Sequence, residues 1–170
     1  MDGIVTLLPN ELALVDRATA EPAAFAAIYD HYFPRVYNYV RYRINDADMA
    51  DELTAQVFER VLTKLNSYRS ERAPFAAWLF AIARNTINDY VRAQKRRRWL
   101  SLEVLRDRPG NEPRPEEVVV HTETRAELLA AISCLGERER DLIALKFAAG
   151  QTNRRIAKLT GLSESHVGVL

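Results

Sequence analysis

Arginine and asparagine side chains recur at helical spacing between residues 75 and 98, opposite a row of apolar residues. The sequence FAAWLFAIARNTINDYVRAQKRRR places Arg84, Asn85, Asn88 and Arg92 on this polar side. The apolar side consists of Phe75, Leu79, Ala83, Ile87, Tyr90 and Val91. Arginine attracts phosphate at any base sequence, whereas an asparagine amide can pair with a base edge. The pattern therefore predicts an amphipathic helix that binds nucleic acid, with a solvated basic face as the alternative.

A second segment, residues 46–59, contains five acids and no base. Its apolar residues are spaced as the buried stripe of a helix, with the acids on the outer side. No histidine or cysteine cluster accompanies these acids, which disfavours catalysis or metal binding. We expect this face to attract a basic protein partner, because complementary charge raises both the rate and the specificity of association.

Composition indicates an all-α globular protein, with 48% hydrophobic residues and only six glycines in 170. The net charge of +1 does not identify a partner, whereas the separation of acids from bases suggests two partner surfaces. Cys134 has no second cysteine to pair with, and its apolar neighbours predict a buried position. No signal pattern or apolar run of about 20 residues occurs. We expect a cytoplasmic protein with no membrane insertion, metal site, catalytic residue or cofactor.

The fold class predicted is two small helical domains joined by a flexible, acidic, Pro-rich linker. Residues 1–20 form an N-terminal extension with a short helix, and residues 21–99 form the first domain. Residues 100–121, which contain three prolines, form the linker, and residues 122–170 form the second domain. We expect Pro34 to kink or divide the first long helix.

The last twenty residues match the pattern of a helix-turn-helix. Residues of the required types stand at the required separations: Ile156, Ala157, Gly161, Leu162, Val167 and Leu170. Gly161 permits a left-handed turn, and Ser163 is expected to cap the second helix. That helix presents Glu164, Ser165 and His166 toward a major groove. It ends at Leu170 after about two turns, shorter than a usual recognition helix, so we expect it to be truncated. An ordinary helical hairpin is the alternative.

Four stretches occur together in this order: FAAIYDHYFPRVYNYV, DADMADELTAQVFERVLTKL, FAAWLFAIARNTINDYVRAQKRR and LGERERDLIALKFAAGQTNRRIAKLTGLSESHV. Their combination resembles the small bacterial RNA polymerase sigma factors of the extracytoplasmic-function (ECF) group, in the sigma-70 family. The resemblance covers nearly the whole chain from about Glu21. It implies a promoter-specificity subunit that is not itself an enzyme, with residues 21–99 as sigma region 2 and residues 122–170 as sigma region 4.

The resemblance also implies partners and site residues. Core RNA polymerase, through the β′ clamp helices and the β subunit, promoter DNA and an anti-sigma factor are the implied partners. The implied polymerase contacts are Asp51, Glu52, Leu53, Gln56 and Phe58. The implied contacts to the −10 element are Tyr68, Arg69, Ser70, Arg72, Phe75, Arg84, Asn85, Asn88, Arg92 and Arg96. The implied contacts to the −35 element are Arg154, Arg155, Ser163, Glu164, Ser165 and His166.

Two positions depart from the common pattern. Ala81 and Ile82 stand where primary sigma factors carry adjacent tryptophans that wedge the duplex open. This difference, usual for the ECF group, implies weaker melting and stricter promoter choice. Arg154 and Arg155 stand where acids are common, which adds potential phosphate contacts. The alternatives are a helix-turn-helix regulator that binds DNA without polymerase, an adaptor that holds a partner without reading DNA, and, last, a nucleic-acid enzyme.

Overall fold

The structure is a computed structural model that describes residues 8, 10–102 and 121–169. These residues contain no strand, which confirms the predicted all-α fold class. The α-helices are α1 (Glu11–Ala20), α2 (Phe25–Arg43), α3 (Ala47–Lys64), α4 (Phe75–Leu102), α5 (His121–Ser133), α6 (Glu137–Ile143), α7 (Asn153–Thr160) and α8 (Glu164–Val169). Short 3₁₀ turns precede α2 (η1, Pro22–Ala24) and follow α3 (η2, Leu65–Ser67), and a π-helical turn follows α6 (η3, Ala144–Ala148). Most of the predicted linker lies outside the described residues.

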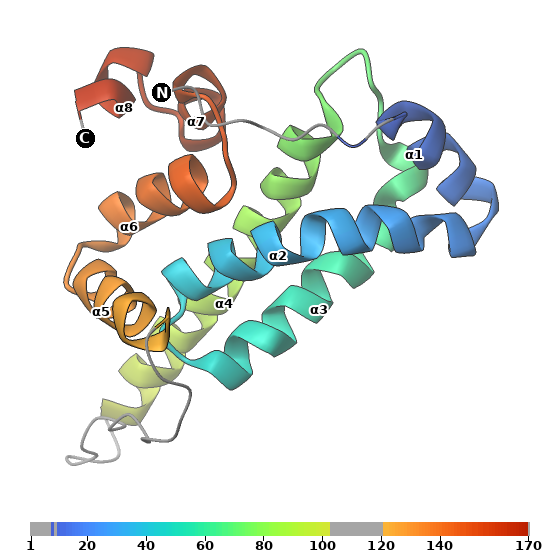
Figure 1. Ribbon diagram of the computed structural model, residues 1–170. Helices are drawn as coiled ribbons and strands as arrows, with labels where there is room; N and C mark the ends of the chain where they lie inside the picture. Colours follow the sequence, from blue (N-terminus) through green and yellow to red (C-terminus); the bar gives the residue numbers. More distant parts are fainter. Residues whose placement is uncertain (1–7, 9, 103–120, 170) are drawn as a thin grey trace.

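The first half of the chain, from α1 to α4, is a helical bundle. In it α2 packs against α3 and α4, and α1 lies across one end (Figure 1). The apolar stripe predicted for α4 is buried along its first three turns, from Phe75 through Leu79 to Ala83, each with no exposed surface. Phe75 lies at the centre of an aromatic cluster. Its ring centroid is 5.6 Å from that of Tyr32 and 5.3 Å from that of Tyr68. These contacts anchor the start of the polar helix firmly in the core.

Two local features shape the helices on which the site residues stand. The Asp46 side chain accepts a 3.0 Å hydrogen bond from the backbone N–H of Met49 and so caps the acidic helix α3. Pro34 lies inside α2, which continues unbroken from Phe25 to Arg43. Of the two effects predicted for Pro34, the division of the helix is wrong, because the helix continues past the backbone bond that proline cannot donate; the kink stays a prediction.

The second half of the chain runs from α5 to α8, and its last two helices, α7 and α8, form the predicted helix-turn-helix. Gly161 ends α7 with φ 76°, in the left-handed region, and Ser163 Oγ accepts a 3.2 Å hydrogen bond from the backbone N–H of His166. The anchors Ile156 and Val167 are buried. Cys134, in contrast, is exposed, so its predicted burial is wrong. Ile132, near the end of α5, is buried, whereas Cys134 lies on a different face of this turn.

We expect Gly161→Ala to destabilise the fold by about 1–2 kcal/mol, because a Cβ atom disfavours the left-handed backbone. A Cβ at this position meets no atom within 4 Å, so crowding does not contribute to the cost. Urea unfolding measures the change. Gly168→Ala is the matched control. It lies inside α8, where a Cβ would be 3.5 Å from Asn153 Nδ2, an ordinary contact. Equal effects of the two substitutions would contradict the backbone explanation.

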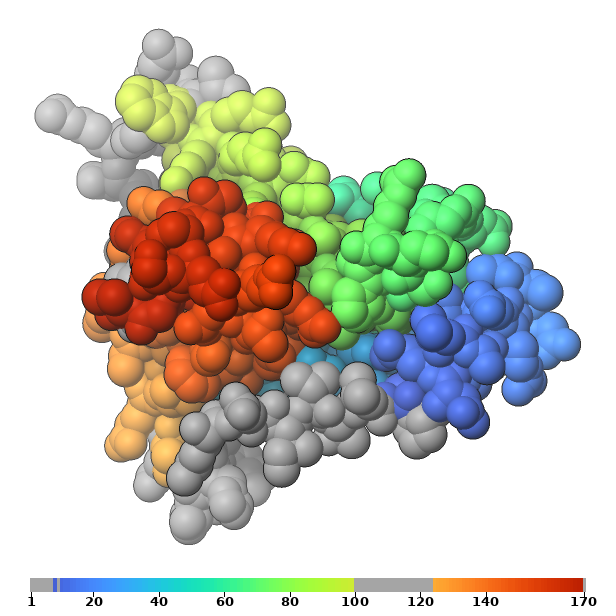
Figure 2. All heavy atoms as spheres, turned by 90° about the horizontal axis from the view of Figure 1, so that it is seen from above, coloured from blue at the N-terminus to red at the C-terminus, as the bar shows by residue number. Residues whose placement is uncertain are grey.

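The two halves pack on each other in the described structure. Buried residues of the second half, including Leu145 and Ile156, belong to the same apolar cluster as those of α2 and α4. Figure 1 shows α5 to α8 together on one side of the first-half bundle, and Figure 2 shows this half in contact with α4. The division of the chain into domains at residues 21–99 and 122–170 stays a prediction, and this packing adds an interface between the two parts.

Candidate nucleic-acid interface

The polar side of α4 has two surroundings. Asn85, Arg92 and Arg96 are exposed to solvent. Arg84 and Asn88 are instead partly buried and bind groups beneath the second half. The structure therefore brings only part of the predicted cationic front to the open surface. The exposed part retains one amide for a base edge and two guanidinium groups for phosphates.

Asp141 on α6 is the centre of a polar network that joins the two halves. Its Oδ1 atom accepts hydrogen bonds from Tyr39, at 2.9 Å, and from Arg43, while its Oδ2 accepts from Arg84 Nε at 2.7 Å. The Asp141 side chain is 8% exposed and that of Arg43 is 6% exposed, so this is a buried ion pair. Arg43 also donates to Asn88 Oδ1 at 3.0 Å. Each oxygen of the carboxylate thus has a charged donor, as burial of a charge requires.

Two arginines of the first half also donate hydrogen bonds to backbone carbonyls of the second half. Arg84 Nη1 donates to the Leu159 carbonyl, near the end of α7, at 2.7 Å. Arg35 Nη2 donates to the Ala149 carbonyl at 2.5 Å. An exposed ion pair, Lys95 Nζ to Glu137 Oε2 at 2.8 Å, joins α4 to α6. Sequence reasoning missed this interface. Asp141 is the third acid of the segment ERERDLI, after Glu137 and Glu139, so its residue type does not single it out.

Side chains of the loop before α4 donate hydrogen bonds to nearby backbone carbonyls and so fix the shape of the loop. Tyr68 donates to the Ala73 carbonyl at 3.1 Å, and Arg69 donates to the Asn66 and Tyr68 carbonyls, each at 2.8 Å. Ser70 and Arg72 are exposed at its tip. Phe75, predicted to contact DNA, has no exposed surface and is a core residue in this structure. Its burial does not fit a direct DNA contact, and the same applies in large part to Tyr68, at 9% exposed.

A cleft of about 260 Å³ lies between this loop and α7. Arg72 and Trp78 line it from the first half, and Arg155 and Lys158 from the second. Two of these residues, Arg72 and Arg155, are contacts that the family resemblance implies for the −10 and the −35 element respectively, and here they line the same cleft. Arg154, the neighbour of Arg155, is exposed on α7.

The acidic surface of α3 is open. Asp51 and Glu52 are exposed, and Gln56 is half-buried and donates to Glu52 Oε1 at 3.1 Å. Leu53 and Phe58, predicted as polymerase contacts, are 1% and 4% exposed. They pack in the core, because they belong to the buried stripe of this helix, and their burial does not fit a direct contact. The surface available to a partner is therefore the acidic one.

The helix-turn-helix presents its predicted residues to solvent. Ser163, Glu164, Ser165 and His166 are all exposed, at the start of α8. Ser163 has a structural role as well, because its hydroxyl caps the helix and lies 3.1 Å from Ser165 Oγ. The remaining side chains at this helix start are available for a ligand such as a duplex groove.

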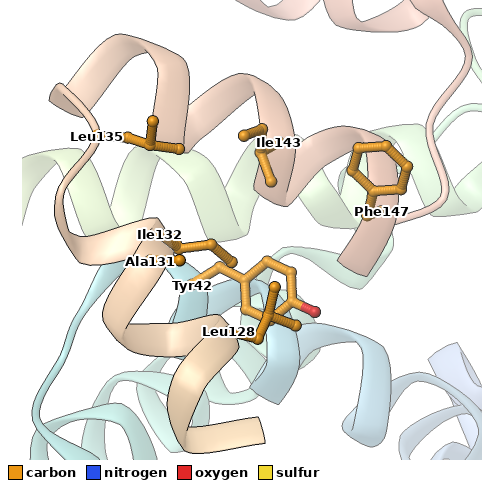
Figure 3. A pocket seen from close by; sticks show the side chains of 7 residues that line it. All are labelled: Tyr42, Leu128, Ala131, Ile132, Leu135, Ile143 and Phe147. Atoms are coloured by element: carbon orange, nitrogen blue, oxygen red, sulfur yellow. The ribbon is translucent and has the colours of Figure 1, made fainter. Parts of the chain in front are cut away.

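An apolar groove of about 560 Å³ lies where α5 faces the end of α2 and η3 (Figure 3). The groove is lined by Tyr42, Leu128, Ala131, Ile132, Leu135, Ile143 and Phe147. Phe147 is 73% exposed and Leu128 46% exposed. Large exposed apolar side chains around a hollow are typical of a binding surface for a protein partner.

Burial raises the pKa of the Tyr39 phenol above its ordinary value, and the neighbouring Asp141 carboxylate raises it further. A tyrosine with a higher pKa in the folded state stabilises the fold below its unfolded pKa of about 10 and loses this contribution as the pH rises above that value. We therefore expect the free energy of unfolding to fall above about pH 10. Urea titrations at increasing pH measure the fall. Tyr39→Phe, which removes the titrating group, should show a shallower decline, and an equal decline would contradict the assignment.

In the parts of the chain that the structure describes, no group of three or more His, Cys, Asp or Glu residues is placed to hold a metal ion. None of the helices described there is long and apolar enough to cross a membrane.

Residues 28–97 match the Sigma-70 region 2 family, a range that includes α3, the loop and the polar face of α4. The chain is 33% identical over 142 residues to the ECF RNA polymerase sigma factor RpoE of Cereibacter sphaeroides, covering 84% of this chain and 77% of that one. The chain belongs to the ECF RNA polymerase sigma factor family. This membership supports the sigma-factor interpretation over a helix-turn-helix regulator that acts without polymerase.

A further relative of this family is the ECF RNA polymerase sigma factor BldN of Streptomyces coelicolor, 31% identical over 160 residues. The match covers 94% of this chain but only 61% of BldN. Among solved structures, the fold is similar to that of the sigma factor RpoE in complex with the anti-sigma factor NepR from Bartonella quintana, with a TM-score of 0.66 at 19% identity. The match covers 85% of this chain and 88% of that one. CnrH in complex with the cytosolic domain of CnrY gives a TM-score of 0.63 at 20% identity over 92% and 86% of the two chains.

Proposed function

We propose that this chain is a promoter-specificity subunit that binds core RNA polymerase and recognises the −10 and −35 elements. The observation that carries the proposal is the pairing of an open acidic surface on α3 with a cationic, amide-bearing surface on α4, within the segment that matches Sigma-70 region 2. The first surface suits a basic protein partner, and the second suits DNA. The chain acts through binding energy and is not itself an enzyme.

The −10 contacts in this proposal are the exposed groups at the loop and along α4. Ser70 and Arg72 lie at the loop tip, where they can reach an unstacked base and its phosphate. Asn85 is the candidate for reading a base edge, with Arg92 and Arg96 on the backbone. Arg84 and Asn88 join them only if the second half moves away from α4.

The −35 contacts are the exposed start of α8 together with Arg154 and Arg155 on α7. His166 and Ser165 can meet base edges, while the arginines add phosphate contacts that do not depend on sequence. Residues 122–170 then read duplex DNA, and residues 21–99 read the separated strand. In this proposal, the boundary between the two domains separates the part that binds duplex DNA from the part that binds a single strand.

The partners proposed are the β′ clamp helices for the α3 surface, the polymerase β subunit, and an anti-sigma factor. The sigma factor RpoE of Bartonella quintana, which has a similar fold, was co-crystallised with the anti-sigma factor NepR, which supports the last of these. We assign the apolar groove beside Phe147 to the anti-sigma factor, because its exposed apolar rim suits a helix with an apolar face. With these partners, the location that we propose for the chain is the cytoplasm.

In vitro transcription with purified core polymerase tests the proposal. We expect core polymerase with this chain to initiate at a small set of promoters selected from a random library, and core polymerase alone to initiate at none of them. Co-elution of the chain with core polymerase measures the protein contact separately. Sequence-specific DNA binding without co-elution and without initiation would overturn the proposal in favour of a regulator that acts without polymerase.

A further inference from the structure

Three charged side chains from three helices meet in the interface between the halves. Asp141, on α6, bridges Arg43, on α2, and Arg84, on α4. The side chains of Asp141 and Arg43 are 8% and 6% exposed, and that of Arg84 is 23% exposed. One carboxylate therefore serves two guanidinium groups in a region from which most solvent is excluded.

The same contacts use groups that α4 would need for DNA. Arg84 gives Nε to the Asp141 carboxylate and Nη1 to the Leu159 carbonyl. Asn88 Oδ1 accepts from Arg43. Carboxylate and phosphate oxygens both accept strong, charge-assisted hydrogen bonds from a guanidinium group, so Asp141 occupies an N–H group of Arg84 that a backbone phosphate could otherwise use.

We infer that Asp141 is a latch that holds the chain in a closed state, and that DNA competes with Asp141 for Arg84. The latch itself follows from the contacts, whereas the competition rests on the DNA-binding role of α4 proposed above. Asp141 is a positioning residue, which reaches DNA only through its effect on Arg84 and Asn88. When the halves separate, both arginines regain water and Arg84 becomes available to a strand.

The closed state is sensitive to Asp141 because of where the charges lie. Removing the Asp141 carboxylate destabilises the closed state, because Arg43 is then buried without a counter-charge while the two halves are docked. The same removal costs little in the open state, where water solvates the arginines. The ion pair Lys95–Glu137 spans the same interface but is more than half exposed on both sides, so its contribution is small.

Distances between the halves test the latch directly. Spin labels at Thr63→Cys on α3 and Arg138→Cys on α6, both exposed positions, report the separation in a Cys134→Ser background. Asp141→Asn is compared with Glu137→Gln, which removes the same charge from the same helix. We expect Asp141→Asn to raise the population with a longer distance by at least about tenfold, because one partner of a buried pair is lost. Glu137→Gln should change it by about twofold at most, because that pair is exposed.

A milder variant keeps the test valid if Asp141→Asn fails to fold, which circular dichroism would show. Tyr39→Phe removes one hydrogen bond to Asp141 and leaves every charge in place. We expect it to raise the open population in the same direction by a smaller factor. Carbodiimide coupling of Lys95 to Glu137 in the unlabelled chain gives a second readout, and its yield should fall in Asp141→Asn. Unchanged distances and yields in the folded variants would overturn the latch.

Fluorescence anisotropy with single-stranded DNA tests the competition. Asp141→Asn should bind more tightly than Glu137→Gln by several-fold, a comparison that cancels the effect of net charge on phosphate attraction. Opening without tighter binding would overturn the competition, and with it the proposed role of Arg84 in DNA binding. Unchanged distances would overturn the latch and leave the proposed promoter function standing.

Discussion

Asp51→Arg should weaken the binding of this chain to core RNA polymerase by well over tenfold and reduce transcription with it. Asp51 is exposed on the acidic surface of α3, with Glu52 beside it and no base between residues 46 and 59. Replacing the carboxylate by a guanidinium removes an attraction to a basic partner and adds a repulsion. Losing one side of a charged pair that is buried in an interface costs about 2–5 kcal/mol, so if Asp51 forms such a pair the affinity should fall by well over tenfold. Competition binding with labelled core polymerase measures the fall.

The fold itself should tolerate this substitution. An exposed helix position away from caps and buried groups changes stability by no more than about 0.5 kcal/mol, which thermal unfolding checks. Asp30→Arg is the matched control, because it makes the same charge change at an exposed position on α2. If both variants lose polymerase to the same extent, net charge rather than the α3 surface is responsible. If Asp51→Arg binds normally, the polymerase contact does not lie on this surface.

Helical periodicity explains why so much of the first half could be predicted. The apolar residues of α3 and α4 recur every three or four positions, which fixes both the helix and its buried face. Leu53 is one of the regularly spaced apolar residues that predict the buried stripe of α3, together with Ala50 and Val57, and the structure confirms its burial. The family resemblance pointed instead to a partner contact for Leu53 and Phe58. Where the two disagree, burial supports the periodicity, because it follows from the packing of this chain itself.

The interface between the halves could not be predicted in the same way. A surface arginine and a buried interface arginine look alike in a sequence, because the difference lies in what packs against them. Arg84 and Arg92 both fall on the polar side of α4, yet only Arg84 lies beneath the second half. The helix-turn-helix was predictable because its turn requires particular residue types, such as a glycine that adopts φ 76° at position 161. Docking depends on non-local contacts, and Asp141 looks in the sequence like the other two acids of α6, Glu137 and Glu139.

Phe75→Ala should destabilise the protein by about 3–5 kcal/mol, because it removes a fully buried aromatic ring and leaves a cavity. The ring contacts Tyr32, Tyr68 and Trp78, with centroid distances between 5.3 and 5.6 Å, so its loss loosens three neighbours at once. Tyr68 belongs to the loop before α4, so the loop should lose order as well. Urea unfolding measures the stability, and protease cleavage in the loop measures its order.

Phe75→Leu separates a core role from a DNA role at this position. Leucine keeps most of the buried volume, so the cost in stability should be less than half that of Phe75→Ala, but it has no ring on which a base can stack. If Phe75 acts only through the core, binding of single-stranded DNA by Phe75→Leu should follow its stability and stay close to that of the parent chain. A loss of DNA binding in a variant that remains folded would show that this ring leaves the core to meet a base. Because Phe75 has no exposed surface where α4 begins, we expect the first result.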